Sequence, residues 1–258
     1  MTHSSPSADI ILITGASSGL GAGMAREFAR RGYHLALCAR RMDKLQALKA
    51  EIITYAPGCK IAIAPLDVTD HQAVFACFRG FYQKFGRIDK VIVNAGIGAG
   101  AKVGKGGFTQ NLATIETNFI AAFAQAEAAM EIFYEQTKGH LVIMSSMSAM
   151  RGLRGSMTAY SASKAGIAAM AEGIRADVLK KRGIDVSTLF PGYIRTELNE
   201  NVPKSRTPFI IDASMGARLL VDAVERRRAK AYVPFWPWWG IGLAMRLLPL
   251  SLANRLNL

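Results

Sequence analysis

Short apolar runs alternate with longer segments of helical period along almost the whole chain, and this alternation is the strongest constraint on the fold. The runs predict strands at Ile10–Thr14, Leu35–Ala39, Ile61–Pro65, Lys90–Asn94, His140–Ser145, Asp185–Leu189 and Ala231–Pro234. The segments between them predict helices at Leu20–Arg31, Asp43–Tyr55, Asp70–Phe85, Ala113–Gln136, Thr158–Lys180 and Asp212–Arg227. Such an order is typical of βαβ units, in which the strands form a parallel sheet.

The predicted fold class is α/β, a single doubly wound (Rossmann) parallel sheet with helices on both faces. The chain has 258 residues, half of them hydrophobic, which suffices for one large core. We expect one dinucleotide-binding and catalytic domain over residues 1–258, with 232–258 as a hydrophobic, Trp-rich extension. A sheet of this kind binds its ligand beyond the carboxyl ends of the strands, so functional residues should follow the strands directly.

A glycine-rich segment, Thr14-Gly15-Ala16-Ser17-Ser18-Gly19-Leu20-Gly21, follows the first strand and opens the first helix. Glycines allow a tight turn and let the backbone approach a pyrophosphate, whose charge then faces the helix N-terminus. Such a loop can also be a simple turn, but its place between strand and helix favours a dinucleotide site.

The end of the second strand bears on the choice of cofactor. An NAD enzyme places an acidic residue there to hold the ribose 2′-hydroxyl, whereas this chain has Ala39-Arg40-Arg41. Guanidinium groups bind a 2′-phosphate through charge-assisted hydrogen bonds. We therefore expect NADP, and two incidental arginines at an exposed helix start are the alternative.

Tyr160 and Lys164 open a long predicted helix with the spacing YxxxK, which places both side chains on one face. A tyrosine is a poor acid at neutral pH, since its reference pKa is about 10. A nearby ammonium favours the phenolate, so we expect Lys164 to lower the pKa of Tyr160.

In combination, the TGxxxGxG spacing at Thr14–Gly21, Asn94-Ala95-Gly96, YxxxK at Tyr160–Lys164 and PGxxxT at Pro191–Thr196 resemble the short-chain dehydrogenase/reductase family. The resemblance implies an NADP-dependent oxidoreductase that acts on CH-OH/C=O groups. The function we expect is that of an NADPH-dependent carbonyl reductase, in which the nicotinamide supplies the hydride and Tyr160 the proton. The resemblance implies cofactor contacts from Gly15, Ser17, Ser18, Gly19, Leu20, Gly21, Arg40, Arg41, Asp67, Val68, Asn94, Ala95, Gly96, Tyr160, Lys164, Pro191, Gly192, Ile194 and Thr196. Asp67 and Val68 would contact adenine, and Thr196 the nicotinamide carboxamide. Val93 stands where the family often has a further asparagine.

The resemblance also assigns the catalytic residues Ser146, Tyr160, Lys164 and Asn118. Tyr160 would supply the proton, Lys164 would hold the ribose, and Asn118 would hold a water in the proton relay. An asparagine satisfied within the packing is the alternative for Asn118. The usual serine-to-tyrosine spacing ends on Met147, which cannot donate a hydrogen bond, so Ser146 is expected to orient the substrate. Ser145 and Ser148 stay open.

The substrate pocket should be shaped by Ala95–Gly107 and by the loop from Tyr193 to Ile211. The strings Cys38–Arg41, Val93–Gly98 and Pro191–Ile194, followed by the Trp-rich end, are loosely similar to actinobacterial reductases of long-chain β-keto (mycolate-type) esters. That likeness implies an apolar carbonyl substrate, of a 3-oxoacyl or other lipid-like kind, and a role in lipid metabolism. The extension itself is interpreted as an oligomer interface or pocket cover, or alternatively as an interfacial helix at a membrane.

The net charge of +13 indicates an anionic partner. No nucleic-acid-binding motif accompanies it, so a phosphate-bearing cofactor or an anionic membrane surface is expected instead. Three scattered cysteines without a CxxC pair predict free thiols, and four distant histidines predict no metal site. We expect a cytoplasmic homo-oligomer (dimer or tetramer), or alternatively one that is peripheral at the inner face of the membrane. A non-catalytic NADP-binding regulator and a membrane-surface protein on the same fold are the alternative functions.

Overall fold

The computed structural model describes residues 8–181, 183–197 and 209–255, and it contains one seven-stranded sheet. The strand order is β3-β2-β1-β4-β5-β6-β7, and every pairing is parallel. The strands are β1 (Ile10–Thr14), β2 (His34–Ala39), β3 (Ile61–Pro65), β4 (Lys90–Val93), β5 (Gly139–Met144), β6 (Ile184–Pro191) and β7 (Lys230–Val233). The predicted doubly wound parallel sheet is thus confirmed.

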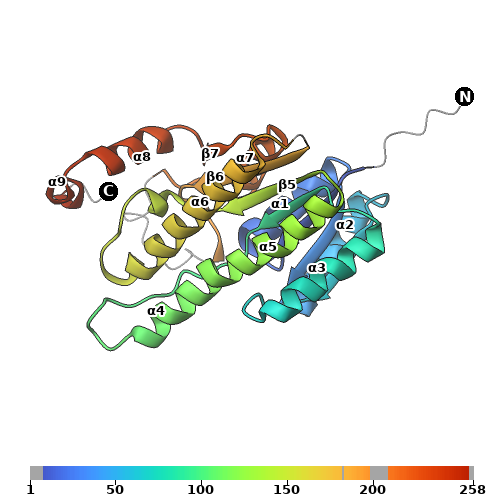
Figure 1. Ribbon diagram of the computed structural model, residues 1–258, viewed down its shortest axis with the longest axis horizontal. Helices are drawn as coiled ribbons and strands as arrows, with labels where there is room; N and C mark the ends of the chain where they lie inside the picture. The colour runs from blue at the N-terminus through green and yellow to red at the C-terminus, as the bar shows by residue number, and fades with distance from the viewer. Residues whose placement is uncertain (1–7, 182, 198–208, 256–258) are drawn as a thin grey trace, which may run out of the picture.

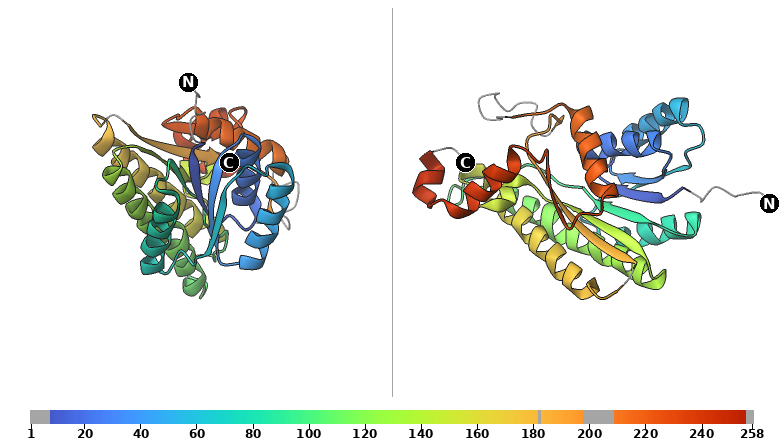
Figure 2. Two further views of the ribbon diagram at one scale, coloured as in Figure 1. Left: turned by 90° about the vertical axis from the view of Figure 1, so that its right-hand side faces the viewer. Right: turned by 90° about the horizontal axis from the view of Figure 1, so that it is seen from above.

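Helices cover both faces of this sheet (Figures 1 and 2). One layer consists of α1 (Gly19–Arg30), α2 (Met42–Tyr55) and α7 (Ala213–Glu225), and the other of α3 (His71–Phe85), α5 (Ala121–Glu135) and α6 (Thr158–Val178). Each layer packs its own apolar cluster on the sheet, so strands β1, β4 and β5 are buried along their whole length. This burial on both faces explains why the strands read as continuous apolar runs.

One predicted helix, Ala113–Gln136, differs from the structure. The helical rod starts earlier, at α4 (Phe108–Ile115), passes through a π-helical turn at Glu116–Ile120 and continues as α5. Apolar periodicity could not show this turn, because a π-turn adds only one residue to a helix. The other predicted boundaries agree with the structure within two residues. All three cysteines carry free thiols.

The C-terminal segment follows β7, which already contains Tyr232 and Val233 of the predicted extension. It forms α8 (Trp238–Leu247) and α9 (Leu250–Arg255). On its inner side, Trp238 and Met245 join a third apolar cluster with Met147, Met150 and Phe190. The extension therefore packs beside the segment that follows β5. None of the helices within the described ranges is long and apolar enough to cross a membrane.

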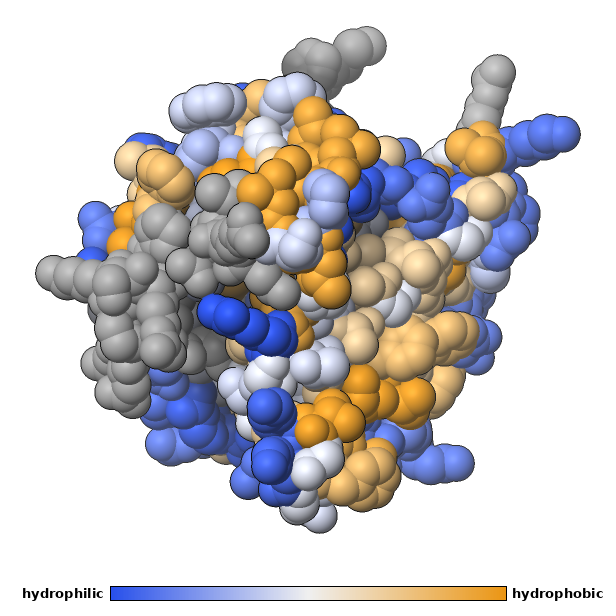
Figure 3. Space-filling view, turned by 90° about the vertical axis from the view of Figure 1, so that its left-hand side faces the viewer, coloured by the Kyte–Doolittle hydropathy of each residue, from blue (hydrophilic) through white to orange (hydrophobic). Residues whose placement is uncertain are grey.

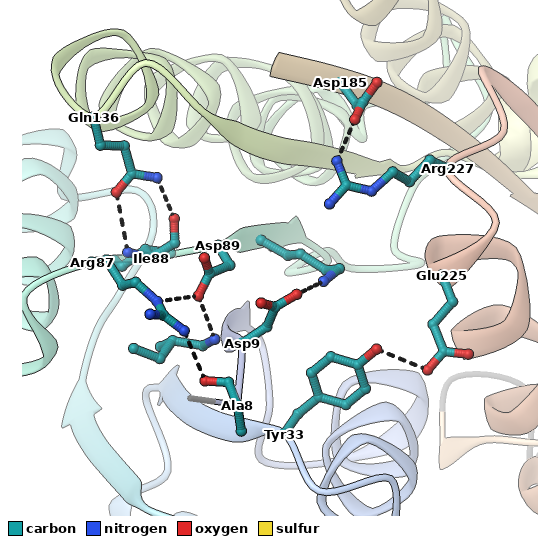
Figure 4. A network of polar contacts seen from close by, with 12 residues as sticks. Ala8, Asp9, Tyr33, Arg87, Ile88, Asp89, Gln136, Asp185, Glu225 and Arg227 are labelled. Atoms are coloured by element: carbon teal, nitrogen blue, oxygen red, sulfur yellow. Dashed lines mark hydrogen bonds and ion pairs between the residues drawn. The ribbon is translucent and has the colours of Figure 1, made fainter. Parts of the chain in front are cut away.

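Polar contacts close the amino edge of the sheet (Figure 4). The Asp89 carboxylate accepts hydrogen bonds from the Ile10 backbone N–H and the Arg87 guanidinium, each at 2.8 Å. The ammonium of Lys90, only 3% exposed, donates to Asp9 at 2.5 Å. Because these groups are paired with one another, the amino edge of the sheet can bury charged residues. A ligand can approach at the opposite, carboxyl edge of the sheet.

Candidate active site

The glycine loop between β1 and α1 is shaped by close backbone approaches. A Cβ atom at Gly21 would lie 2.5 Å from the Gly15 carbonyl oxygen and 2.7 Å from the Asn94 Nδ2. Gly15 itself has φ +62°, and its Cβ would lie 2.9 Å from the Ala95 Cα. Only glycine fits these two positions. At Gly15 and Gly21 the loop thus has bare backbone next to the start of α1, which suits a pyrophosphate.

Asn94, directly after β4, hydrogen-bonds the backbone at the start of this loop. Its Nδ2 donates to the Thr14 carbonyl oxygen at 2.9 Å, and the Thr14 hydroxyl accepts from the backbone N–H groups of Asn94 and Ala95 at 3.0 and 3.1 Å. The side chain of Asn94 therefore holds two strand ends together.

Arg41 extends over the glycine loop. Its guanidinium donates to the Ser18 hydroxyl at 2.5 Å and to the Ser17 hydroxyl at 3.3 Å. On its other side it forms an ion pair with Glu197 at 3.4 Å. A guanidinium and two hydroxyl groups thus meet at one place beside the turn, where they could bind a phosphate.

The side chain of Arg40 is directed toward Asp67. It is 71% exposed, and its guanidinium lies 3.8 Å from the Asp67 carboxylate. Asp67 accepts hydrogen bonds from the backbone and hydroxyl of Thr69, and these bonds hold the pKa of the Asp67 carboxyl below its usual range. Val68, next to it, is buried. The predicted adenine-contacting pair is thus placed with Asp67 beside Arg40 and Val68 in the core, and its contact with adenine stays a prediction.

Tyr160 and Lys164 lie on the first turns of α6; Lys164 is buried and Tyr160 is partly exposed. The Lys164 Nζ donates to the Met144 carbonyl oxygen at 2.9 Å and lies 5.9 Å from the centre of the Tyr160 ring. Burial lowers the pKa of Lys164 to about 8. Burial also raises the pKa of Tyr160, against a hydrogen bond with the Ser146 side chain that lowers it. We expected Lys164 to lower the pKa of Tyr160, and in the protein alone it does not. Burial disfavours both charged forms, the Lys164 ammonium and the Tyr160 phenolate.

The three serines after β5 have different partners. The Ser145 hydroxyl donates to the Lys164 carbonyl oxygen at 2.8 Å. The Ser146 hydroxyl accepts from the Ser148 N–H at 3.2 Å, and the Ser146 side chain is near enough to Tyr160 to lower the pKa of that tyrosine. The Ser148 hydroxyl is buried without a partner in the described part of the chain. Ser146 is thus the serine that the fold brings to Tyr160.

Asn118 lies in the π-helical turn and is 1% exposed. Its Oδ1 accepts from the Ile97 N–H and its Nδ2 donates to the Ile97 carbonyl oxygen, both at 2.8 Å. A Cβ at Gly96 would lie 3.0 Å from the Asn118 Oδ1 and 3.6 Å from the Lys164 Nζ, so the three residues meet. Both ends of the Asn118 amide are thus hydrogen-bonded to Ile97, with one donor and one acceptor site in use.

The Pro191–Thr196 segment leaves β6 along the opposite side of the site. The Thr196 side chain lies within 3.7 Å of the Cβ position of Gly19, so this segment meets the start of α1. Ile194 is buried and bridges to Ile211, which closes the predicted pocket loop Tyr193–Ile211 at its base. Residues 198–208 of that loop lie outside the described residues.

Two aromatic residues near the site were not among the predicted site residues. The Trp238 indole of α8 covers Gly192, where a Cβ would lie 2.1 Å from the ring. Tyr193 packs edge-on against Trp238 with 5.5 Å between ring centres, and its proximity helps to raise the pKa of Tyr160. The Trp-rich tail was the available signal, but nothing in the sequence places Trp238 on a residue that follows β6.

The chain matches the short chain dehydrogenase family over residues 9–207. It is 48% identical to an uncharacterized oxidoreductase of Mycobacterium tuberculosis over 245 residues, which cover 95% of this chain and 96% of the relative. In structure it is similar to an alcohol dehydrogenase of Thermococcus sibiricus complexed with 5-hydroxy-NADP (TM-score 0.76, 23% identity, 87% and 95% of the two chains). It is also similar to a short chain dehydrogenase/reductase of Burkholderia phymatum in complex with NAD (TM-score 0.82, 20% identity, 97% and 95%). This chain belongs to the short-chain dehydrogenase family of oxidoreductases.

Proposed function

We propose that this protein is an NADPH-dependent carbonyl reductase in which Tyr160 is the proton donor. The observation that carries the proposal is that Tyr160 and Lys164 lie together on α6, with Lys164 buried, and that the Ser146 side chain is near enough to lower the pKa of Tyr160. Two hydroxyl groups that lie this near to each other can both reach one carbonyl oxygen within about 2.6–3.2 Å. They would polarise the carbonyl and hold it in place.

The mechanism divides the work between these residues. A bound NADPH supplies the hydride. Tyr160 transfers its proton to the carbonyl oxygen as negative charge develops there, and Ser146 stabilises that charge by a hydrogen bond. Lys164, held by the Met144 carbonyl oxygen, has donors left for the ribose and for the Tyr160 oxygen. Asn118 keeps Ile97 in place beside Gly96 and thereby shapes the wall next to Lys164.

The choice of NADPH over NADH depends on this chain's own residues, because one solved neighbour holds an NADP derivative and another holds NAD. Arg41, with Ser17 and Ser18, supports a phosphate on the adenine ribose. The two positions directly after β2 are occupied by Arg40 and Arg41, and not by an acidic residue that would accept a hydrogen bond from a ribose 2′-hydroxyl. NADP(H) is therefore the cofactor that these residues favour.

The substrate that we propose is an apolar ketone, such as a 3-oxoacyl or another lipid-like chain. Residues 145–150, which follow β5 and carry Ser146, contain no charged residue. Met147 and Met150 of this segment pack with Trp238 and Phe190 in an apolar cluster beside the site. A charged substrate would find few partners on this side.

The test is a screen of NADPH oxidation, followed by absorbance, over ketones and 3-oxoacyl esters of increasing chain length. Tyr160→Phe should lower kcat on the best substrate by about 10²–10⁴-fold, while NADPH affinity measured by fluorescence stays the same. Near wild-type kcat in Tyr160→Phe contradicts the mechanism. NADPH binding without turnover of any carbonyl in the wild type would favour a regulator.

A further inference from the structure

Helix α8 carries apolar residues on both its inner and its outer side. Trp238, Gly242 and Met245 face inward at helical spacing and are buried. Trp239, Leu243 and Leu247, four residues apart, form an outward stripe that is 46%, 47% and 73% exposed. A surface helix of a globular protein normally has a polar outer face, so this outer stripe points to a partner.

The outer stripe of α8 is part of a larger apolar face at one end of the molecule (Figure 3). Further exposed residues of this face come from the C-terminal segment and from the segment before and within α4: Phe235, Trp236, Leu250, Val103, Phe108 and Leu112. The two parts are joined through the loop after β5. The α8 residue Gly242 lies against Met147, and Gly100 lies against the Ser156 carbonyl oxygen.

This loop also carries Ser146, so the apolar face lies next to a segment that contributes to the candidate active site. We call it the tail face, and define it by the outer stripe of α8 and the residues given above. Its position distinguishes it from exposed apolar residues elsewhere, such as Leu179 at the other end of α6.

The segments that build the tail face contain no acidic residue. The chain has no Asp or Glu between Asp89 and Glu116, between Glu135 and Glu172, or after Glu225. The cations Lys102, Lys105, Arg154 and Arg246 are exposed in these segments. Glu172 of α6 lies near enough to Arg246 for that arginine to lower its pKa, but the four cations outnumber this one carboxylate. The face is therefore apolar with an excess of positive charge, and its partner should be apolar and negatively charged.

A second copy of this chain does not meet that requirement. A two-fold dimer through the tail face would place the same cations opposite one another, with no carboxylate from these segments between them. A bilayer with anionic lipids offers negative headgroups to the cations and an apolar interior to the leucines. Tryptophans such as Trp236 and Trp239 are typical of the headgroup level.

We propose that the tail face docks on the surface of an anionic lipid bilayer, which places the loop that carries Ser146 next to the lipid. The docking needs no catalysis. Its second consequence, that an apolar carbonyl substrate enters from the bilayer, rests on the proposed reductase function. The short helices α8 and α9 would lie in the interface and not span it.

The experiment is co-sedimentation of the full chain with vesicles of phosphatidylcholine alone and of an equal mixture of phosphatidylcholine and phosphatidylglycerol. Binding should be at least about tenfold stronger to the anionic vesicles and should weaken with salt. Leu243→Ser/Leu247→Ser should lower binding about tenfold or more. Arg246→Gln should lower it about fivefold.

The matched controls lie away from the tail face. Ile53→Ser/Leu179→Ser removes two exposed apolar residues, and Arg228→Gln removes one exposed cation, and neither should change binding. Equal loss in variants and controls, or no preference for anionic vesicles, overturns the proposal. So does a wild-type oligomer that Leu243→Ser/Leu247→Ser dissociates in solution without loss of vesicle binding.

Activity on a short water-soluble ketone separates this proposal from the proposed function. Leu243→Ser/Leu247→Ser should keep that activity while it loses vesicle binding and turnover of a bilayer-embedded ketone. A wild type that binds anionic vesicles but reduces no ketone leaves the docking intact and contradicts the reductase function. Equal turnover of the embedded ketone by wild type and variant contradicts delivery from the bilayer.

Discussion

Neighbouring serines at the end of β5 take separate roles, because successive side chains of a strand point in opposite directions. Ser145 is directed to the Lys164 carbonyl oxygen and fastens α6, whereas Ser146 is directed to Tyr160. One hydroxyl group therefore serves the packing, and its neighbour serves the site.

This division predicts three different outcomes for alanine variants. Ser146→Ala should lower kcat about 10²–10³-fold, because a donor to the developing negative charge is lost. Ser145→Ala should instead lower the free energy of unfolding by about 1 kcal/mol, because one buried hydrogen bond is lost. Ser148→Ala should be mild in both steady-state kinetics and urea unfolding. A severe kinetic defect in Ser148→Ala would show that the loop presents a different serine to the substrate.

The two arginines after β2 also differ, and the difference sharpens the prediction for the cofactor. Arg41 donates to Ser17 and Ser18, whereas Arg40 is exposed beside Asp67. Arg41→Ala should weaken NADPH binding by about 2 kcal/mol and leave NADH binding nearly unchanged, while Arg40→Ala should have a smaller effect. Fluorescence titration with both cofactors measures this. Equal affinities for NADPH and NADH in the wild type would contradict the NADP assignment.

At the scale of elements, α8 is packed on the end of β6 by one contact between an indole and a glycine. The Trp238 side chain occupies the space in which a Cβ of Gly192 would lie. It is 5% exposed and joins Met147 and Met150 in one cluster. The position of the C-terminal helix and the shape of the loop around Ser146 are thus coupled.

This contact predicts a non-additive pair of substitutions. Gly192→Ala should lower the free energy of unfolding by about 1–3 kcal/mol, because the added methyl group overlaps the ring. Trp238→Ala should cost about 3–5 kcal/mol, because it leaves a cavity. The double variant should be less destabilised than the sum of the two, since the methyl group added at position 192 then meets no indole. Urea unfolding of the four proteins measures the coupling, and strict additivity would mean that α8 packs elsewhere.

At the scale of the whole molecule, the amino edge of the sheet contains a buried histidine that links stability to pH. His140 in β5 is 0% exposed, and its Nε2 lies 2.8 Å from the Ser187 hydroxyl of β6. Burial lowers the pKa of His140 to about 3, and Arg227 and Lys90 act in the same direction against Asp185. The folded protein therefore holds this ring neutral.

The sign of the pH dependence follows from the proton balance. Between pH values of about 6.5 and about 3 the unfolded chain binds a proton at His140 and the folded chain does not. The free energy of unfolding should therefore fall as the pH falls through this window, by up to about 1.4 kcal/mol per unit from this residue. His140→Gln should reduce this slope in urea unfolding at pH 7, 6 and 5. His71→Gln, which removes a partly exposed ring, is the control, and an unchanged slope in His140→Gln would contradict the assignment.

Several features of the protein could be predicted from local patterns. The parallel sheet follows from the length and spacing of apolar runs, because strands buried on both faces admit few polar residues. The glycine loop and the spacing of Tyr160 and Lys164 are visible for the same reason: a turn or one face of a helix depends on residues that are close in the chain. The rule that ligands bind beyond the carboxyl ends of parallel strands then brings these motifs to one edge, and the family comparison agrees with them.

Other features depend on contacts between residues that are distant in the chain, and only the tertiary structure decided them. Ser146 is distinguished from Ser148 by where the loop meets Tyr160, and Arg41 from Arg40 by where the start of α2 meets the glycine loop. The engagement of Asn118 by Ile97 needs the π-helical turn, which no apolar period reveals. The inner and outer sides of α8 are both apolar, so hydrophobicity alone could not tell which one is buried; the contact of Trp238 with Gly192, 46 residues away in sequence, decides it. The physical reason is that packing selects one partner among several that sequence spacing leaves equivalent.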